Sequence, residues 1–201
     1  MFSLLKPSDA AIASFVAARS GERPSFAQAG LTRQPEGVDA AGATAGYAVD
    51  RYEAVVGVGE ADFARAREAV LGWRMFELGW VELSAPGPAK PGVDVGVLAR
   101  LPGLWSLNPC RVVYLDDRPE KATGPECAFG YATLPGHVER GEERFCVRLD
   151  PKNERVSYSI LAVSRPAAWI ARVGAPIARP LQRRFGRGSL DAMRRAVGAS
   201  G

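Results

Sequence analysis

Apolar and polar positions alternate through most of the second half of the chain. Six segments carry this period of two, and the connections between them are rich in Pro, Gly, Asp and Asn, which favour turns. The six are FELGWVEL, VDVGVLARL, PCRVVYLDD, ECAFGYATL, EERFCVRLD and RVSYSILAV. An earlier segment, YAVDRYEAVVGVG, also reads as a strand. Because the connections are short, we expect neighbouring strands to pair antiparallel, with a tight hairpin at DPKNE.

Helical periodicity interrupts this pattern once, directly after the first strand. In EADFARAREAVLGW, the apolar residues Phe63, Ala66, Val70 and Trp73 recur at helical intervals, and acidic residues occupy the first turn. A second, short amphipathic helix capped by Ser8 is expected near the N-terminus. The order of elements therefore predicts an α+β fold.

The C-terminal segment carries two stripes at helical spacing. The apolar stripe contains Ile170, Val173, Ile177, Leu181 and Phe185, and the other contains Arg172, Arg179 and Arg183. Pro176 and Pro180 each remove a backbone donor, so we expect the helix to break or bend near Gly174. Ser189 is expected to cap a separate last segment, LDAMRRAV. A curved sheet must cover its apolar face, and this helix laid across it would leave an apolar cavity.

The chain of 201 residues has the length of one domain. We place that domain at residues 47–201. Residues 1–46 are expected to form an N-terminal helix followed by an irregular connection, because turn formers are spread throughout residues 20–46 without a sustained period.

Three cysteines and one histidine restrict the chemistry available to the chain. Cys110, Cys127 and Cys146 lie in apolar strand-like segments without metal-ligand spacing, so we expect them to pack as small hydrophobic residues. Neither a structural zinc nor a disulfide framework is expected, and we predict no metal and no cofactor. No apolar run is long enough to span a bilayer and no cleavage pattern follows the first residues, so we predict a cytoplasmic protein.

The net charge of +4 is unevenly distributed. Eight arginines and a single acid, Asp191, lie between Arg165 and Arg195. These arginines lie opposite an apolar stripe, which is typical of a solvated helix face, and no interleaved aromatic surface accompanies them. We therefore expect no specific nucleic-acid binding, and at most a weak contact of this helix with anionic surfaces.

Several of these segments together resemble a known family. They are AREAVLGWRMFELGWVEL, LNPCRVVYLDD, FGYATLPGHVERGEERFCV, SRPAAWIARVGAPIARPLQRRF and SLDAMRRAV. They resemble the bacterial and plant family called domain of unknown function nineteen-ninety, from about Tyr47 to Val197, and GYATLPGHVERGEERF is the most specific block. That family implies no reaction.

More distantly, the order of elements is similar to that of the helix-grip superfamily. Its members include steroidogenic lipid-transfer domains, birch-pollen-allergen-like proteins and polyketide cyclases. The resemblance implies a curved antiparallel sheet of about seven strands wrapped on a long C-terminal helix. One departure is that only one clear helix follows the first strand, where helix-grip domains usually carry two short ones.

The parity of the strands predicts a polar cluster on the apolar face. Glu143 shares a face with Phe145, Val147 and Leu149, and the same counting brings Arg111, Tyr131 and Tyr158 to that side of their own strands. The cluster of Glu143, Arg111, Tyr131 and Tyr158 has two interpretations. It is a polar anchor or acid–base pair in a pocket, or it contains an Arg–Glu pair that only satisfies buried charges.

Two further residues are candidates on weaker grounds. His137 lies in a Pro-Gly connection beside Glu139, Glu142 and Glu143, where a lone histidine is more often solvated or bonded to backbone than catalytic. Trp80 belongs to a group of aromatic residues that is mostly core material, some of which would line a pocket. No nucleophile elbow, GxGxxG or P-loop occurs.

Two functional hypotheses follow. The leading one is a protein that binds a small hydrophobic molecule or lipid between the sheet and the C-terminal helix. Its candidate ligand-binding residues are Arg111, Tyr131, Glu143, Tyr158, Trp80 and His137. The alternative is an enzyme of the cyclase or isomerase type that uses the Glu143, Arg111 and Tyr131 cluster. No catalytic residue is assigned.

Overall fold

The computed structural model describes the chain except for residues 45, 120–122, 168–174 and 199–201. Its strands are β1 (Phe2–Ser3), β2 (Ala48–Val58), β3 (Val81–Ser84), β4 (Asp94–Leu101), β5 (Leu104–Arg118), β6 (Glu126–Thr133), β7 (Glu139–Leu149) and β8 (Arg155–Pro166). Its α-helices are α1 (Asp9–Ala17), α2 (Val38–Thr44), α3 (Gly59–Leu71) and α4 (Ala175–Gly198). Three 3₁₀ turns, η1 (Leu31–Arg33), η2 (Pro35–Gly37) and η3 (Arg74–Phe76), complete the described elements.

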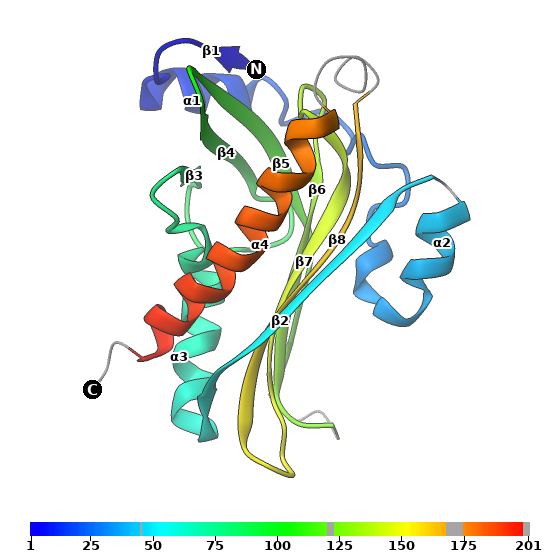
Figure 1. The fold of residues 1–201 in the computed structure, drawn as a ribbon, viewed down its shortest axis with the longest axis vertical. Helices are drawn as coiled ribbons and strands as arrows, with labels where there is room; N and C mark the ends of the chain where they lie inside the picture. Colours follow the sequence, from blue (N-terminus) through cyan, green and yellow to red (C-terminus); the bar gives the residue numbers. More distant parts are fainter. Residues whose placement is uncertain (45, 120–122, 168–174, 199–201) are drawn as a thin grey trace.

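One curved antiparallel sheet organises the molecule (Figure 1). Its strands follow the order β2-β8-β7-β6-β5-β4-β3, and β1 pairs with β5 outside this path. The predicted antiparallel pairing is confirmed throughout, including the hairpin at residues 150–154, where Leu149 pairs with Val156. In the segment FELGWVEL only the last residues are extended, because Phe76 lies in η3.

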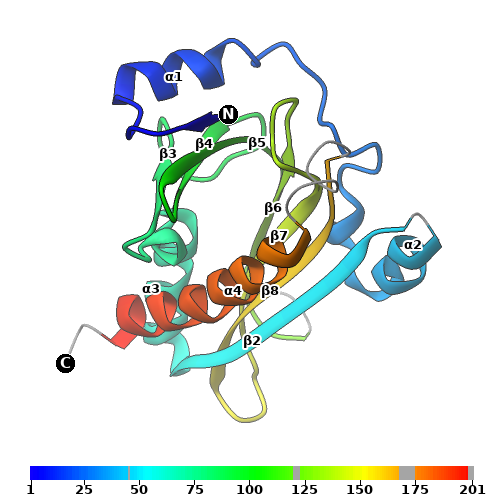
Figure 2. The same ribbon diagram turned by 45° about the horizontal axis from the view of Figure 1, so that its top comes forward.

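The concave face of the sheet carries the main core. Helices α3 and α4 lie against this face, and α4 crosses it diagonally (Figure 2). The predicted face of α3 is buried, since Ala66 and Val70 are fully shielded. The strand positions that parity assigned to the inner face are buried as well, among them Phe129, Phe145, Val147, Val156, Tyr158 and Ile160.

The N-terminal segment covers the other face, and here one prediction was wrong. Residues 20–46 contain η1, η2 and α2, although their composition indicated an irregular connection. Phe26 and Val38 from this segment pack against Leu161 and Val163 of β8. Periodicity does not reveal these short elements, because η1 buries only Thr32, η2 buries no side chain and, among its described residues, α2 buries only the side chain of Val38. The helix predicted after Ser8 is confirmed as α1, with the Ser8 hydroxyl accepting from the Ala11 N–H.

Helix α4 is longer and more regular than its sequence indicated. It runs without interruption from Ala175 to Gly198 and includes Pro180, which removes only one backbone bond near the first turns. Ser189 therefore does not begin a new segment, and its hydroxyl lies 2.8 Å from the Tyr158 hydroxyl of β8. The predicted break at Gly174, and the positions of Ile170, Arg172 and Val173, lie outside the described residues.

Helix α4 approaches β2 so closely that a glycine is required at the contact. A Cβ atom at Gly186 would lie 2.6 Å from ring carbons of Tyr52. At Gly188, two residues along the same helix, a Cβ atom would meet Leu78 at 3.4 Å or more, which is ordinary contact. The two glycines therefore differ in packing and share the same helical context.

We expect Gly186→Ala to destabilise the protein by about 1–3 kcal/mol, because the tight packing outweighs the better helix propensity of alanine. Gly188→Ala should instead leave stability unchanged or raise it by up to about 1 kcal/mol. Urea unfolding of the two variants measures the difference. Equal stabilisation by both would contradict the close approach of α4 to β2.

Candidate functional site

A pocket of about 490 Å³ lies between the concave face of the sheet and α4. Most of its wall is apolar and comes from η3, the connection between η3 and β3, β4, β5 and α4, including Phe76, Trp80, Val97, Leu104, Leu181 and Phe185. Polar side chains gather where β2, β7 and β8 meet α4. They include Asp50, Glu139, Glu143, Ser164 and Gln182, with Tyr131 and His137 nearby. We call these residues the polar end of the pocket.

Tyr131 and Glu143 form the innermost polar pair. They lie directly opposite each other on β6 and β7, and the Tyr131 hydroxyl donates to Glu143 Oε2 at 2.8 Å. The ring of Tyr131 packs edge-on against Phe145. Burial raises the pKa of Glu143 to about 7, although the bond from Tyr131 acts in the opposite direction. Near neutral pH this carboxyl group therefore exists in both protonation states.

Glu139 and Gln182 connect the polar end to α4. Gln182 Nε2 donates to Glu139 Oε1 at 2.6 Å and to the Ser164 hydroxyl at 3.2 Å. Burial raises the pKa of Glu139 above its ordinary value. The Oε1 atom of Gln182 is buried and accepts no hydrogen bond from any described residue. Protein atoms cover this acceptor, so the group that Gln182 contributes to the polar network is its Nε2 donor.

Charge at the polar end is mainly negative. Arg179 of α4 forms an ion pair with Asp50 of β2 at 2.7 Å. Within the described part of the chain, no Lys or Arg forms an ion pair with Glu139 or Glu143. Glu142 points elsewhere, since its carboxylate accepts hydrogen bonds from Thr32 and from the Gly30 N–H of the N-terminal segment.

His137 lies in the connection between β6 and β7 and lines the pocket. Its Nδ1 atom accepts from the Glu139 N–H at 2.8 Å. Burial lowers the pKa of His137 to about 3, so the imidazole is neutral and carries its proton on Nε2. A neutral histidine with one nitrogen occupied by backbone offers a hydrogen-bond donor to the pocket.

The prediction that Arg111 faces the same interior was wrong. A β-bulge between Val112 and Tyr114 shifts the pairing of β5 with β6, so counting back from Leu115 assigns the wrong face. Arg111 pairs instead with Asp94 at 2.6 Å and 2.8 Å and donates to the carbonyl of Ser20. It therefore fixes the N-terminal segment to the sheet and forms no pair with Glu143.

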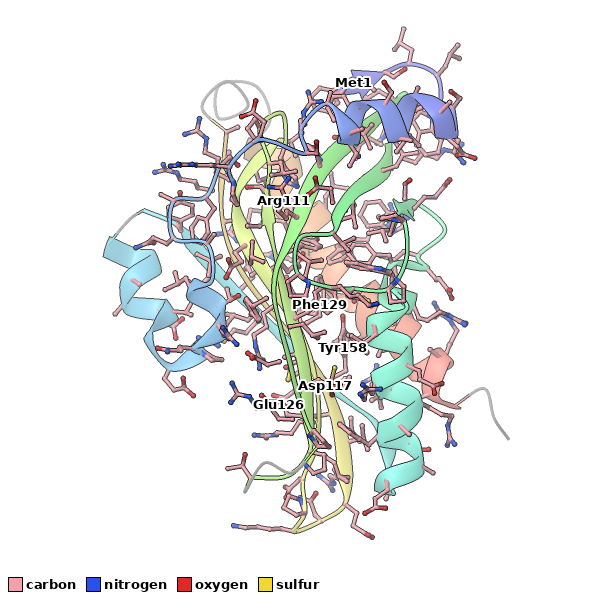
Figure 3. The ribbon with its side chains drawn as sticks, turned by 180° about the vertical axis from the view of Figure 1, so that it is seen from behind. Met1, Arg111, Asp117, Glu126, Phe129 and Tyr158 are labelled. Carbon is pink, nitrogen blue, oxygen red and sulfur yellow. The ribbon has the colours of Figure 1, made fainter. Side chains whose placement is uncertain are left out.

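The remaining candidates divide between the core and the pocket. Tyr158 is fully buried on the predicted face, but its hydroxyl pairs with Ser189, and the residue does not line the pocket. Figure 3 shows Phe129 and Tyr158 on the side of the sheet that faces α3 and α4. Trp80 lines the pocket and stacks beneath Arg184, whose guanidinium lies 4.5 Å from the ring centre.

The sequence did not predict three contributors to the polar end, Asp50, Ser164 and Gln182. Asp50 lies at the start of β2, and Gln182 lies between the apolar and arginine stripes of α4. Neither position breaks its local pattern, because an acid near a strand end and a glutamine on a helix are common at the surface. Only the crossing of α4 over β2 and β8 brings them together.

The described residues contain neither a candidate metal site nor a helix that could span a membrane. No group of three or more His, Cys, Asp or Glu side chains there could hold a metal ion. Among the same residues, no helix is long and apolar enough to cross a membrane.

Residues 29–192 match the model of a family described as a domain of unknown function (DUF1990). A UPF0548 protein of Deinococcus radiodurans is 35% identical, over 98% of this chain and 100% of its own length. A UPF0548 protein of Dictyostelium discoideum is 31% identical, over 100% of this chain and 97% of its own. The resemblance inferred from the sequence is therefore confirmed.

Solved structures share the architecture at low sequence identity. A hypothetical protein of Helicobacter pylori has a TM-score of 0.53 and 12% identity, covering 77% of this chain and 88% of its own. A point mutant of norcoclaurine synthase from Thalictrum flavum has a TM-score of 0.51 and 12% identity, covering 76% and 95%. These likenesses confirm the helix-grip fold, with η3 in place of a second short helix.

The raised pKa of Glu143 predicts a specific pH dependence of stability. Between about pH 4.5 and 7 the folded state keeps a proton that the unfolded state has lost, so this group lowers stability as the pH rises through that window. Glu143→Gln removes the effect. At pH 8 we expect the free energy of unfolding of the variant to be about 1–3 kcal/mol higher than that of the parent. At pH 4 the two free energies should be equal.

Urea unfolding at a series of pH values measures this difference. Glu68→Gln, at an exposed position on α3, is the matched control. Its free energy of unfolding should differ from that of the parent by the same amount at every pH. A flat difference for Glu143→Gln as well would contradict the burial of that carboxyl group.

Proposed function

This chain belongs to the family described as a domain of unknown function (DUF1990), and from that premise we propose that it binds a small hydrophobic molecule or a lipid. The ligand lies between the concave face of the sheet and α4. The observation that carries this proposal is one pocket with an apolar wall and a separate polar end. Its volume of about 490 Å³ lies in the range of small-molecule sites.

The lining sets the orientation of the ligand. An apolar body would lie against Phe76, Val97 and Phe185, which form part of the apolar wall. A polar group would reach Tyr131 and Glu143. The carboxyl groups at this end favour a ligand that donates hydrogen bonds, such as an alcohol or an amine, over one that carries a carboxylate.

A neutral apolar dye tests this proposal. We expect Nile red to gain fluorescence on binding the parent chain, and Ala99→Trp to weaken that binding at least about tenfold because the indole fills the pocket. Ala64→Trp, on the exposed side of α3, should bind as the parent does. Native mass spectrometry of the purified chain should also detect a retained ligand. Equal dye binding by both tryptophan variants would contradict a ligand in this pocket.

A second candidate function rests on the bond between Tyr131 and Glu143. A carboxylate with a pKa of about 7 in an apolar pocket is suited to remove a proton from carbon. In an isomerase or cyclase reaction, Glu143 would take the proton and the Tyr131 hydroxyl would donate to the enolate oxygen that forms. Arg111 has no part in this version of the hypothesis, because it lies on the other side of the sheet.

Hydrogen exchange tests the second candidate without knowledge of the substrate. 2-Tetralone, an apolar enolisable ketone, should exchange its α-hydrogens in D₂O faster with the parent chain than without it. Glu143→Gln should slow the catalysed exchange by about a hundredfold, whereas Glu68→Gln should not change it. Proton NMR follows the exchange. Catalysis that persists in Glu143→Gln would eliminate this residue as the base.

A further inference from the structure

A second hollow lies on the face of the sheet opposite the pocket. It has a volume of about 820 Å³ and is formed by β2, β5, β6, β7 and β8 together with residues 33–36. In Figure 3, Glu126 lies on this side of the sheet, away from α3. The arginines of the hollow are Arg33, Arg51, Arg118, Arg144 and Arg148, and its acids are Glu36, Glu53, Asp116 and Glu126. We call it the outer groove.

Arg144 has an incomplete set of partners within the outer groove. The residue is only 8% exposed, yet its one charged partner is Glu126, with Nη2 to Oε1 at 3.3 Å. Charge-assisted bonds of this kind are normally shorter, at about 2.7–2.9 Å. Its Nε atom is buried and has no hydrogen-bond partner in the described part of the chain. Protein atoms cover this N–H, so Arg144 contributes its positive charge, rather than its Nε donor, to the groove.

Further donors lie beside Arg144 on the same face. Arg148 follows it on β7 after four residues, is exposed, and forms no ion pair with any described residue. On β8, Ser157 lies opposite Arg148, and Ser159 lies opposite Cys146 between the two arginines. Neither serine hydroxyl forms a hydrogen bond to another described residue. Two guanidinium groups and two hydroxyls therefore share a small area of β7 and β8.

The acids of the outer groove do not neutralise these donors. Asp116 is held by Arg33 at 2.6 Å and also lies 3.4 Å from Arg118. Glu126 accepts from Arg144, and Glu36 lies exposed. Glu53 of β2 lies opposite Ser159, but it is exposed and forms no ion pair with a described residue. Arg148 and the two hydroxyls remain available.

From this arrangement we propose that the outer groove binds a phosphoryl group, presented by a phosphomonoester. Its oxygens accept from Arg148 and from the hydroxyls of Ser157 and Ser159, next to the positive charge of Arg144. Guanidinium groups match phosphoryl oxygens in both charge and geometry, and serine hydroxyls are common phosphate donors. The groove is much larger than one phosphoryl group, so it also accommodates the organic part of the ester. This site is separate from the pocket beneath α4.

Titration calorimetry of the full chain with inorganic phosphate and with phenyl phosphate tests the proposal. We expect saturable binding, tighter for phenyl phosphate, and a weakening of about tenfold or more in Arg148→Gln. Arg155→Gln is the matched control, because it removes the same charge from an exposed position on β8 that does not line the groove. The control should bind within about twofold of the parent.

Further measurements separate the groove from other anion-binding surfaces. Ser157→Ala should weaken binding several-fold without changing the charge, and Ala99→Trp, in the other pocket, should leave it unchanged. The proposal is overturned if the parent shows no saturable binding at millimolar phosphate. It is also overturned if Arg148→Gln and Arg155→Gln lose binding equally, because a chain of net charge +4 attracts anions in general.

Vesicles distinguish a lipid headgroup from a free phosphomonoester as the source of the phosphoryl group. If phosphatidic acid in phosphatidylcholine vesicles sediments the parent chain and Arg148→Gln abolishes this, the phosphoryl group belongs to a lipid. If phenyl phosphate binds with the expected dependence on Arg148 and the vesicles do not sediment the chain, the ligand is a free phosphomonoester. Phosphatidylcholine alone should sediment none of the variants.

Discussion

The position of α4 across the curved sheet depends on contacts that tolerate almost no displacement. Gly186 lets the helix backbone approach the ring of Tyr52, and the buried hydroxyls of Ser189 and Tyr158 lie 2.8 Å apart. Because the sheet curves away from a straight helix, contact at these points leaves open space elsewhere along the interface. The pocket is the space that remains between a curved surface and a straight element held at one side of it.

The same placement of α4 creates the electrostatic character of the polar end. Gln182 and Arg179 come from the helix, and they meet Glu139 and Asp50 of the sheet. Glu143 lies deeper, where its partner is a neutral hydroxyl, so desolvation dominates and its pKa rises. A carboxyl group of this kind exchanges a proton at little free-energy cost near neutral pH, which suits either recognition of a donor group or proton transfer.

Strand periodicity was a sound guide to the inner face of the sheet, because burial of one face forces alternation of side chains. Phe129, Tyr131, Glu143 and Phe145 all lie on the side that parity assigned. Parity failed for Arg111, because a single extra residue in a bulge reverses every position before it and leaves no mark in composition. The elements within residues 20–46 were missed for a different reason. They are stabilised by contact with β8, through Phe26 and Val38, rather than by periodicity of their own.

The chain contains one histidine, and that histidine lines the pocket. Its Nδ1 atom is tied to backbone and its Nε2 atom is available to the interior. In a magnetic resonance spectrum the imidazole therefore produces one set of signals that needs no assignment. Those signals would respond to any molecule that enters the pocket. The signals of His137 therefore report whether the pocket is occupied, without a label or a mutation.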